Sequence, residues 1–175
     1  MAYFINIFSP ETFEAFSKSK RIISGFLERQ ESAATKVKRG DKLICYLTKL
    51  SRWFGVLEVK SDYFRDNTPI FYAADDPFVI RFKVKATILL PKENAIPITE
   101  KKVWDKLSFT KEFDPHTSYW TSKLRFSLNS INEDDGHFLE ELMSEQLTKP
   151  QVYWVDEDKY KKMLSRKPRV YRFLR

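Results

Sequence analysis

The chain has 175 residues, enough for one ordinary domain, and its 42% hydrophobic content excludes a disordered protein. Its formal charge of +7 indicates a polyanionic partner, nucleic acid before a membrane surface, although soluble basic proteins often carry such an excess. Four glycines are too few for a glycine-rich phosphate loop, and no stretch approaches the ~20 apolar residues of a membrane span.

The single cysteine limits both redox chemistry and metal binding. Cys45 lies in an apolar run and has no partner for an internal disulfide, so we expect a buried thiol and a cytoplasmic protein without a signal peptide. The two histidines, His116 and His137, lie in different segments without ligand spacing to another His, Cys or carboxylate. We therefore expect no metal and no cofactor.

The first elements alternate between strand and helix. Residues 3–8 form an apolar, β-branched run that predicts a buried strand. Ser9 as the cap, Pro10 at the first helical position and Glu11 in the first turn predict a helix over 10–17. A basic cluster then leads into residues 22–27, a short strand or an ordered loop that Gly25 interrupts.

A hairpin is predicted next, after a short polar helix at 28–36 and a basic turn that ends at Gly40. Its strands are residues 43–47 and 52–60, the second with aromatic alternation around a central glycine. The following loop, 61–69, returns Phe71 and Tyr72 beside a stiffening proline. These rings either wall a pocket or pack as ordinary, partly buried side chains.

Residues 78–90 show the clearest alternation in the chain. Phe78 and Phe82 fall on the apolar face, whereas Arg81 and Lys83 fall on a basic one. That basic face is either a solvated surface or a rail for phosphates.

The second half of the chain predicts helices. We expect a helix over 100–107, an irregular stretch over 109–124, a last strand over 125–128, and a helix that starts at Asn129 or Ser130. We expect one domain over 1–148 and a C-terminal helical, basic extension over 149–175. From Lys159 onward the extension mixes basic and aromatic residues, which suits a nucleic-acid contact, a solvated helix with a basic tail, or a linker.

Sequential strands with short links predict an α+β fold, a curved and mostly antiparallel sheet that forms a small open barrel flanked by helices.

Catalytic motifs are missing from the sequence, which has no Walker, HExxH or nucleophile-elbow pattern. A metal-dependent nuclease needs several acids on neighbouring strands, and the candidate strands carry Glu58 alone. The sequence therefore favours a protein that is not an enzyme.

The order of these segments resembles the EVE domain family, in the PUA-like fold group that also contains YTH domains. The resemblance rests on YFINIF with its helix, RQESAATKVKRGDKLICYLT, WFGVLEVKSDYFRDNTPIFY, FVIRFKV and the late SINEDDGHFLEEL. It implies a PUA-like barrel of five to six strands. It also implies a side pocket that holds an extruded base, as YTH relatives hold N6-methyladenine in an aromatic cage.

Carried over residue by residue, the resemblance implies that Tyr72 and then Phe71 form one cage wall. The other wall is usually a tryptophan, but Ile23 stands at that position, so the cage is partial, the ligand differs, or another ring replaces the tryptophan. The implied pocket set is Tyr72, Phe71, Ser24, Ile23, Phe26, Trp53, Ser9 and Trp120. The expected contacts to the nucleic-acid backbone are Lys20, Arg21, Lys38, Arg39, Arg81 and Lys83.

We therefore expect a module that binds DNA or RNA, without a membrane, and reads a modified base such as N6-methyladenine or a modified cytosine. The resemblance also implies a place in a modification-dependent restriction system, with a motor or nuclease partner. The alternatives are a nuclease or RNA-modification accessory enzyme, and a protein-interaction domain.

Overall fold

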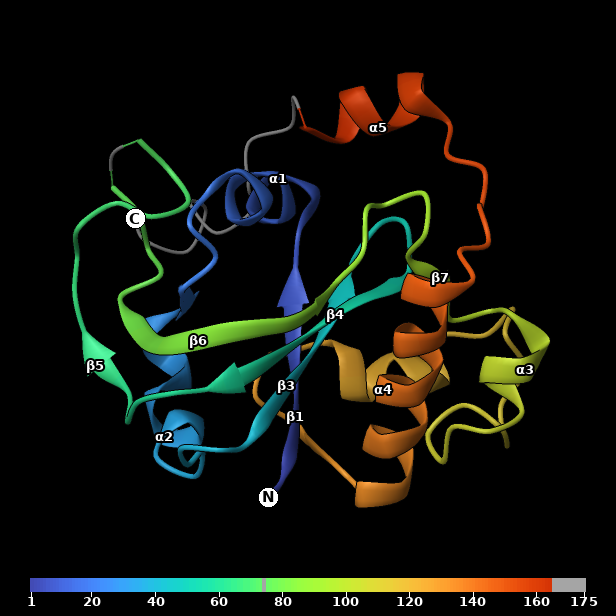
Figure 1. Cartoon of the computed structure of the whole chain (residues 1–175), viewed down its shortest axis with the longest axis horizontal. Coiled ribbons are helices and arrows are strands. Elements are labelled where there is room, and N and C mark those ends of the chain that lie inside the picture. Colours follow the sequence, from blue (N-terminus) through green and yellow to red (C-terminus); the bar gives the residue numbers. More distant parts are fainter. Residues whose placement is uncertain (74, 165–175) are drawn as a thin grey trace.

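A computed structural model describes residues 1–73 and 75–164 (Figure 1). The helical elements are α1 (Pro10–Lys18), η1 (Glu28–Gln30), α2 (Glu31–Ala34), α3 (Lys101–Trp104), η2 (Tyr119–Leu124), α4 (Glu133–Thr148) and α5 (Glu157–Leu164). The strands are β1 (Tyr3–Phe8), β2 (Ile23–Phe26), β3 (Lys42–Leu47), β4 (Arg52–Val59), β5 (Phe64–Arg65), β6 (Ile80–Leu89), β7 (Ile96–Pro97) and β8 (Ser130–Ile131). Within the described residues, no helix is long and apolar enough to cross a bilayer.

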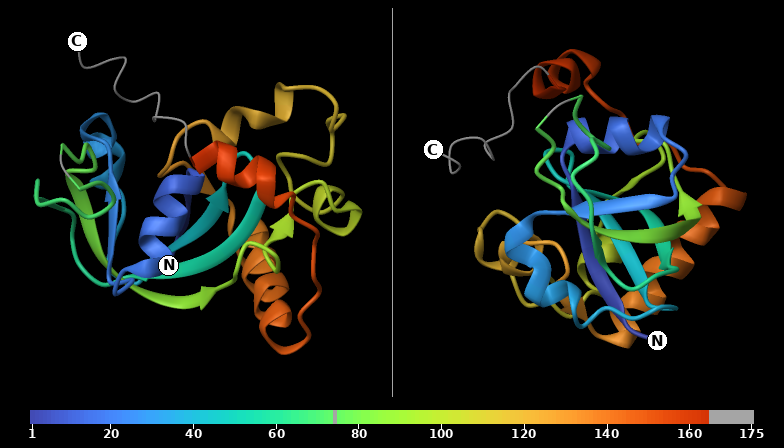
Figure 2. Two further views of the ribbon diagram at one scale, coloured as in Figure 1. Left: turned by 90° about the horizontal axis from the view of Figure 1, so that it is seen from above. Right: turned by 90° about the vertical axis from the view of Figure 1, so that its left-hand side faces the viewer.

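The strands form one curled sheet in the order β2-β6-β4-β3-β1-β8, with β5 paired to β6 and β7 to β4. The pairing of β1 with β3 is parallel and the other pairs are antiparallel. The predicted α+β fold, a curved, open PUA-like barrel flanked by helices, is confirmed. Figure 2 shows the sheet curling beside α1, with α4 on its other side.

The barrel is open between β1 and β2, and side chains instead of a strand ladder bridge this seam. Asn6 Nδ2 of β1 donates to Ser24 Oγ of β2 at 2.8 Å. Farther along, Gln30 Nε2 donates to the Ser127 carbonyl at 3.2 Å, and the Ile7 amide donates to Ser127 Oγ at 2.8 Å. We call this strip between β1 and β2 the seam.

Each face of the sheet carries its own core. Alternate residues of β1 and β4 point to opposite faces, so Ile5 and Trp53 join the core under α4, whereas Phe8 and Phe54 join the core under α1. Cys45 lies in the second core with no exposed surface, which confirms the predicted buried thiol, and burial raises its pKa well above the ordinary value.

Local sequence explains the first helix and the hairpin. Ser9 caps α1 in a capping box with Thr12, as the prediction of the start required. The β3–β4 hairpin pairs antiparallel as predicted. Gly55 is needed there because a Cβ would lie 2.8 Å from the Ile88 carbonyl oxygen.

Three boundaries differ from the prediction. The expected strand at 125–128 is wrong, since β8 covers Ser130–Ile131, and Leu128 takes a left-handed φ of 66°. The late helix begins only at Glu133, because Asn132 Oδ1 accepts the Asp135 amide and so caps it there. The helix expected over 100–107 is shorter and ends at Trp104.

The segment after α4 packs back onto the domain. Arg52 of β4 donates to the carbonyl oxygens of Lys92, Tyr153 and Trp154. Tyr160 of α5 donates to Glu14 of α1 at 2.6 Å, and Figure 1 shows α5 above α1. The predicted basic tail from residue 165 lies outside the described residues.

Candidate nucleic-acid interface

The loop between β5 and β6, residues 66–79, is organised by two buried charged side chains. Asp76 Oδ2 accepts the amides of Ile70, Phe71 and Tyr72 at 2.9, 2.6 and 3.2 Å. Its Oδ1 accepts the Phe78 amide at 2.9 Å. One carboxylate therefore fixes the backbone that carries Phe71 and Tyr72, so these rings project from an ordered turn. We call residues 66–79 the aromatic loop.

Strand alternation led us to expect a phosphate contact from Arg81. The structure instead buries this side chain at the base of the aromatic loop, where it cannot reach a phosphate. The side chain is 2% exposed. It donates to the Phe78 carbonyl at 2.9 Å and to the Thr68 carbonyl, and lies 3.6 Å from Asp66. Backbone and side-chain hydrogen bonds from Thr68 lower the pKa of Asp66, so this acid is ionised beside the guanidinium at neutral pH. The aromatic loop covers the face that alternation assigned to solvent.

The rings of the aromatic loop lie against one another and against the core below α1. Tyr72 stacks on Phe78 with ring centroids 6.0 Å apart and planes 16° apart. Phe71 packs edge-on against Phe78 at 5.3 Å and Phe8 at 6.4 Å. Both predicted rings remain partly exposed. The structure thus places an aromatic wall at the end of β1 where the helix begins.

Gly25 brings the aromatic loop close to β2. A Cβ at this position would lie 2.7 Å from Ile70 Cδ1 and 2.9 Å from Phe78 Cβ, so a larger residue would push the aromatic loop away. The aromatic loop, which carries the predicted rings, therefore packs against β2, the strand that also carries Ser24.

The polar pair in the seam includes a residue that the sequence analysis missed. Asn6 and Ser24 are 2% and 0% exposed, and their mutual hydrogen bond is the only side-chain hydrogen bond that either makes among the described residues. The Ser24 hydroxyl proton and the Asn6 carbonyl oxygen can therefore serve a ligand. A lone asparagine inside the apolar run YFINIF was the available signal.

The other predicted pocket residues divide into two groups. Ser9 is half-buried at the β1–α1 turn and Ile23 is half-buried at the start of β2, whereas Phe26 is buried against Phe82. The two tryptophans are wrongly assigned to the pocket, because they belong to the core under α4. Trp53 is fully buried against Tyr46, and Trp120 packs on Trp104 at 5.0 Å.

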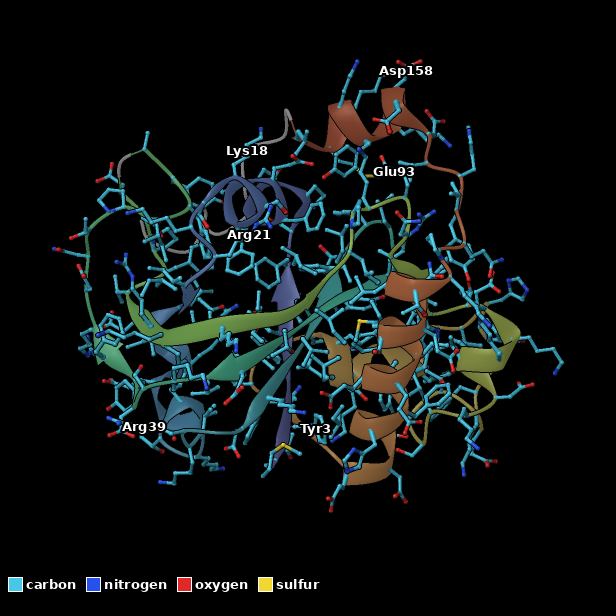
Figure 3. All side chains as sticks on the ribbon, viewed as in Figure 1. Tyr3, Lys18, Arg21, Arg39, Glu93 and Asp158 are labelled. Atoms are coloured by element: carbon cyan, nitrogen blue, oxygen red, sulfur yellow. The ribbon has the colours of Figure 1, made fainter. Side chains whose placement is uncertain are left out.

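The predicted phosphate contacts also divide. Lys20 and Arg21 are exposed just before β2, and the exposed Lys83 pairs with Ile23 in the sheet. Lys38 and Arg39 are exposed in the turn before β3, where Arg39 lies 3.8 Å from Asp62. Figure 3 shows Arg21 beside α1 and Arg39 far below, near α2. Only the first group adjoins β2.

A separate hollow of about 390 Å³ lies between α1 and the turn after β6. Glu14 and Glu93 line it together with Arg21 and Lys92, so its acids balance its bases and it does not favour an anion. Among residues 1–73 and 75–164, no group of three His, Cys, Asp or Glu residues is arranged to hold a metal ion.

The family model described as the EVE domain matches residues 2–142. The chain belongs to the EVE domain family. No curated protein matches it significantly.

Among solved structures, this EVE domain is similar to YTH domains. The YTH domain of Mmi1 in complex with RNA is 14% identical with a TM-score of 0.58, over 85% of this chain and 80% of that one. The YTH domain of Zygosaccharomyces rouxii MRB1 in complex with N6-methyladenosine RNA is 15% identical with a TM-score of 0.57, over 89% and 88%. Protein Atu2648 from Agrobacterium tumefaciens is 17% identical with a TM-score of 0.54, over 81% and 92%. At these identities the likeness establishes the shared fold.

Proposed function

We propose that this EVE domain binds nucleic acid and reads a modified base that is turned out of its stack into the seam beside the aromatic loop. The observations that carry the proposal are the Asn6–Ser24 pair, a buried polar pair with unused hydrogen-bonding capacity, and the partly exposed rings of Phe71 and Tyr72 on the loop that packs against Gly25 of β2. YTH domains of the same fold have been solved with RNA and with N6-methyladenosine RNA, which supports the assignment.

The chemistry of an extruded base fits these residues. Its flat face stacks on Tyr72, a contact worth about 1–3 kcal/mol in single-strand binding proteins. On its polar edge, an acceptor atom accepts a hydrogen bond from the Ser24 hydroxyl, and an N–H group donates one to the Asn6 carbonyl oxygen. Ser9 lies at the rim. A methyl group adds only about 0.8 kcal/mol by area, so discrimination of a methylated base depends on a tight fit against Ile23 and Tyr72.

The exposed charges near β2 supply the phosphate contacts in this proposal. Lys20 and Arg21 are exposed just before β2, and the exposed Lys83 pairs with Ile23 of β2, so we assign the phosphate contacts to these three residues. In this arrangement the chain is a recognition module, and a motor or nuclease partner supplies any restriction activity.

The test is a binding series with short DNA and RNA oligonucleotides that carry methylated, hydroxymethylated or plain bases. We expect tighter binding to one modified base and a fall in affinity as salt rises. Tyr72→Ala should weaken binding to that base about five- to a hundredfold, because it removes the stacking surface.

Tyr119→Ala is the matched control, since Tyr119 is 74% exposed on η2, an element of the opposite face. It should bind like the parent. If Tyr72→Ala and the parent show the same preference for modified over plain oligonucleotides, the assignment of the pocket is wrong. Cleavage of modified DNA by the purified chain with a divalent metal would instead establish the nuclease alternative.

A further inference from the structure

We propose that Phe126, together with Arg29, forms a second stacking site that holds a base next to the extruded one on a single strand. This inference rests on the proposed function, because it assigns a place to the neighbouring nucleotide. It concerns the segment between η2 and β8, to which the sequence analysis gave no role in binding.

Phe126 is one of the exposed large hydrophobic residues of the described chain. Its side chain is 51% exposed, the highest value for any phenylalanine in the described residues. The Arg29 guanidinium carbon lies 5.4 Å from the centre of its ring. A guanidinium over an aromatic ring is planar and cationic, so the pair offers both a flat apolar surface and a charge for the adjacent phosphate.

The backbone that presents this ring is fixed. Ser127 accepts the Ile7 amide on its Oγ and the Gln30 side chain on its carbonyl. Leu128 is 4% exposed with a φ of 66°, and its amide donates to the Ile5 carbonyl at 2.7 Å. A bulky residue in the left-handed region is strained, and such strain is concentrated at functional sites. Here it turns the chain so that Phe126 faces outward while Leu128 faces the core.

The stacking site formed by Phe126 and Arg29 lies on the same seam as the proposed base pocket. Ser127 bonds to Ile7, and Asn6 of the polar pair is the preceding residue of β1. On the β2 side of the seam, Arg29 of η1 lies five residues after Ser24 of β2. The segment that carries Phe126 and the proposed base pocket therefore both adjoin β1 at the seam, as neighbouring nucleotides of one strand require.

The charge around Phe126 favours a nucleic acid over an apolar protein partner. Arg29 and Arg125 are exposed, and neither has an acidic partner within ion-pair distance in the part of the chain that the structure describes. The nearest acid along the chain, Glu28, is already paired with Arg65 at 2.8 Å. One unpaired cation over the exposed ring and a second on the preceding residue match an alternation of bases and phosphates.

The experiment uses the full chain and the modified oligonucleotide that the first screen identifies. Abasic sites are placed one at a time on either side of the modified base. We expect Phe126→Ala to weaken binding to the intact oligonucleotide about five- to a hundredfold, and Phe126→Tyr to retain the parent affinity. With an abasic site at the stacked position, the parent should lose a similar factor and Phe126→Ala should lose nothing more.

Phe113→Ala is the matched control, because Phe113 is 40% exposed between α3 and η2. Its affinity should equal that of the parent, and thermal unfolding shows that each variant is folded. If Tyr72→Ala weakens binding but Phe126→Ala does not, the stacking site is wrong and the pocket stands. If the parent binds no oligonucleotide, both proposals are overturned. An equal loss for intact and abasic oligonucleotides in Phe126→Ala would also overturn the stacking site.

Discussion

The two faces of the sheet use aromatic residues in different ways. Under α4, Trp53, Tyr46 and Trp104 are buried at 5% exposure or less. On the other face, Phe71 and Tyr72 stay partly exposed on the aromatic loop, beside the polar pair of the seam. The first face is closed by apolar packing, whereas the second combines partly exposed rings with a buried polar pair.

This difference shows that counting rings does not locate a site. Trp53 and Trp120 offer large stacking surfaces and were natural substitutes for the ring missing at Ile23, yet both pack in or against the core under α4. What separates the two faces is the combination of partial exposure with a buried polar pair. The following changes test whether the α4 face affects stability alone and the seam affects binding.

Trp53→Ala should have the largest effect on stability. The side chain is fully buried, so its removal leaves a large cavity and should lower the free energy of unfolding by about 3–5 kcal/mol in urea titration. Trp53→Phe should cost less, because Trp53 Nε1 has no hydrogen-bond partner among the described residues. Oligonucleotide affinity of the folded fraction should be unchanged, and a loss of base preference in Trp53→Phe would contradict the division between the faces.

Gly25→Ala should affect both stability and binding. The added Cβ would overlap Ile70 and Phe78, so the aromatic loop must shift, at a cost of about 1–3 kcal/mol. Binding should fall because Tyr72 moves with the aromatic loop. Gly40→Ala is the control: its φ of 89° makes it costly too, but it has nothing within 4 Å and should bind normally. If Gly25→Ala and Gly40→Ala bound oligonucleotides equally well, the aromatic loop would not be part of the binding site.

Alkaline pH should destabilise the fold partly through Tyr46, in the core under α4. Burial raises the pKa of Tyr46 to about 12 from an ordinary 10.0, so the folded state holds the proton that the unfolded state releases. Its contribution to stability is intact below pH 10 and is lost as the pH rises toward 12, by about 1 kcal/mol between pH 10 and 11. Tyr46→Phe should lose correspondingly less stability over that interval in urea titrations. Identical pH slopes for the two proteins would contradict this.

Much of the fold could be predicted from the sequence because its strands obey local rules. The strands of residues 3–8 and 52–60 and the capped first helix depend on period-two alternation and on one serine–proline start, and these are contiguous in the chain. Arg81 was misread because alternation cannot show that a loop returns over one face of its strand.

The candidate site was only half visible in the sequence. Tyr72, Phe71 and Ser24 came from a family resemblance, whereas Asn6 is separated from Ser24 by eighteen residues and the barrel closure that joins them is a property of the whole sheet. The role of Asp76 in fixing three amides depends on a backbone path that no spacing rule describes.

The hydrogen bonds of Arg52 to three carbonyl oxygens bear on which residues belong to the cooperatively folding unit. Two of the three carbonyl oxygens that hold its guanidinium belong to Tyr153 and Trp154, beyond the last residue that the family model matches. A chain truncated after Thr148 would leave the Arg52 guanidinium, 7% exposed in the intact structure, with one of its three acceptors. We therefore expect residues 149–164 and the barrel to unfold as one cooperative unit, so that the energetic boundary of the domain lies beyond the boundary of the family model.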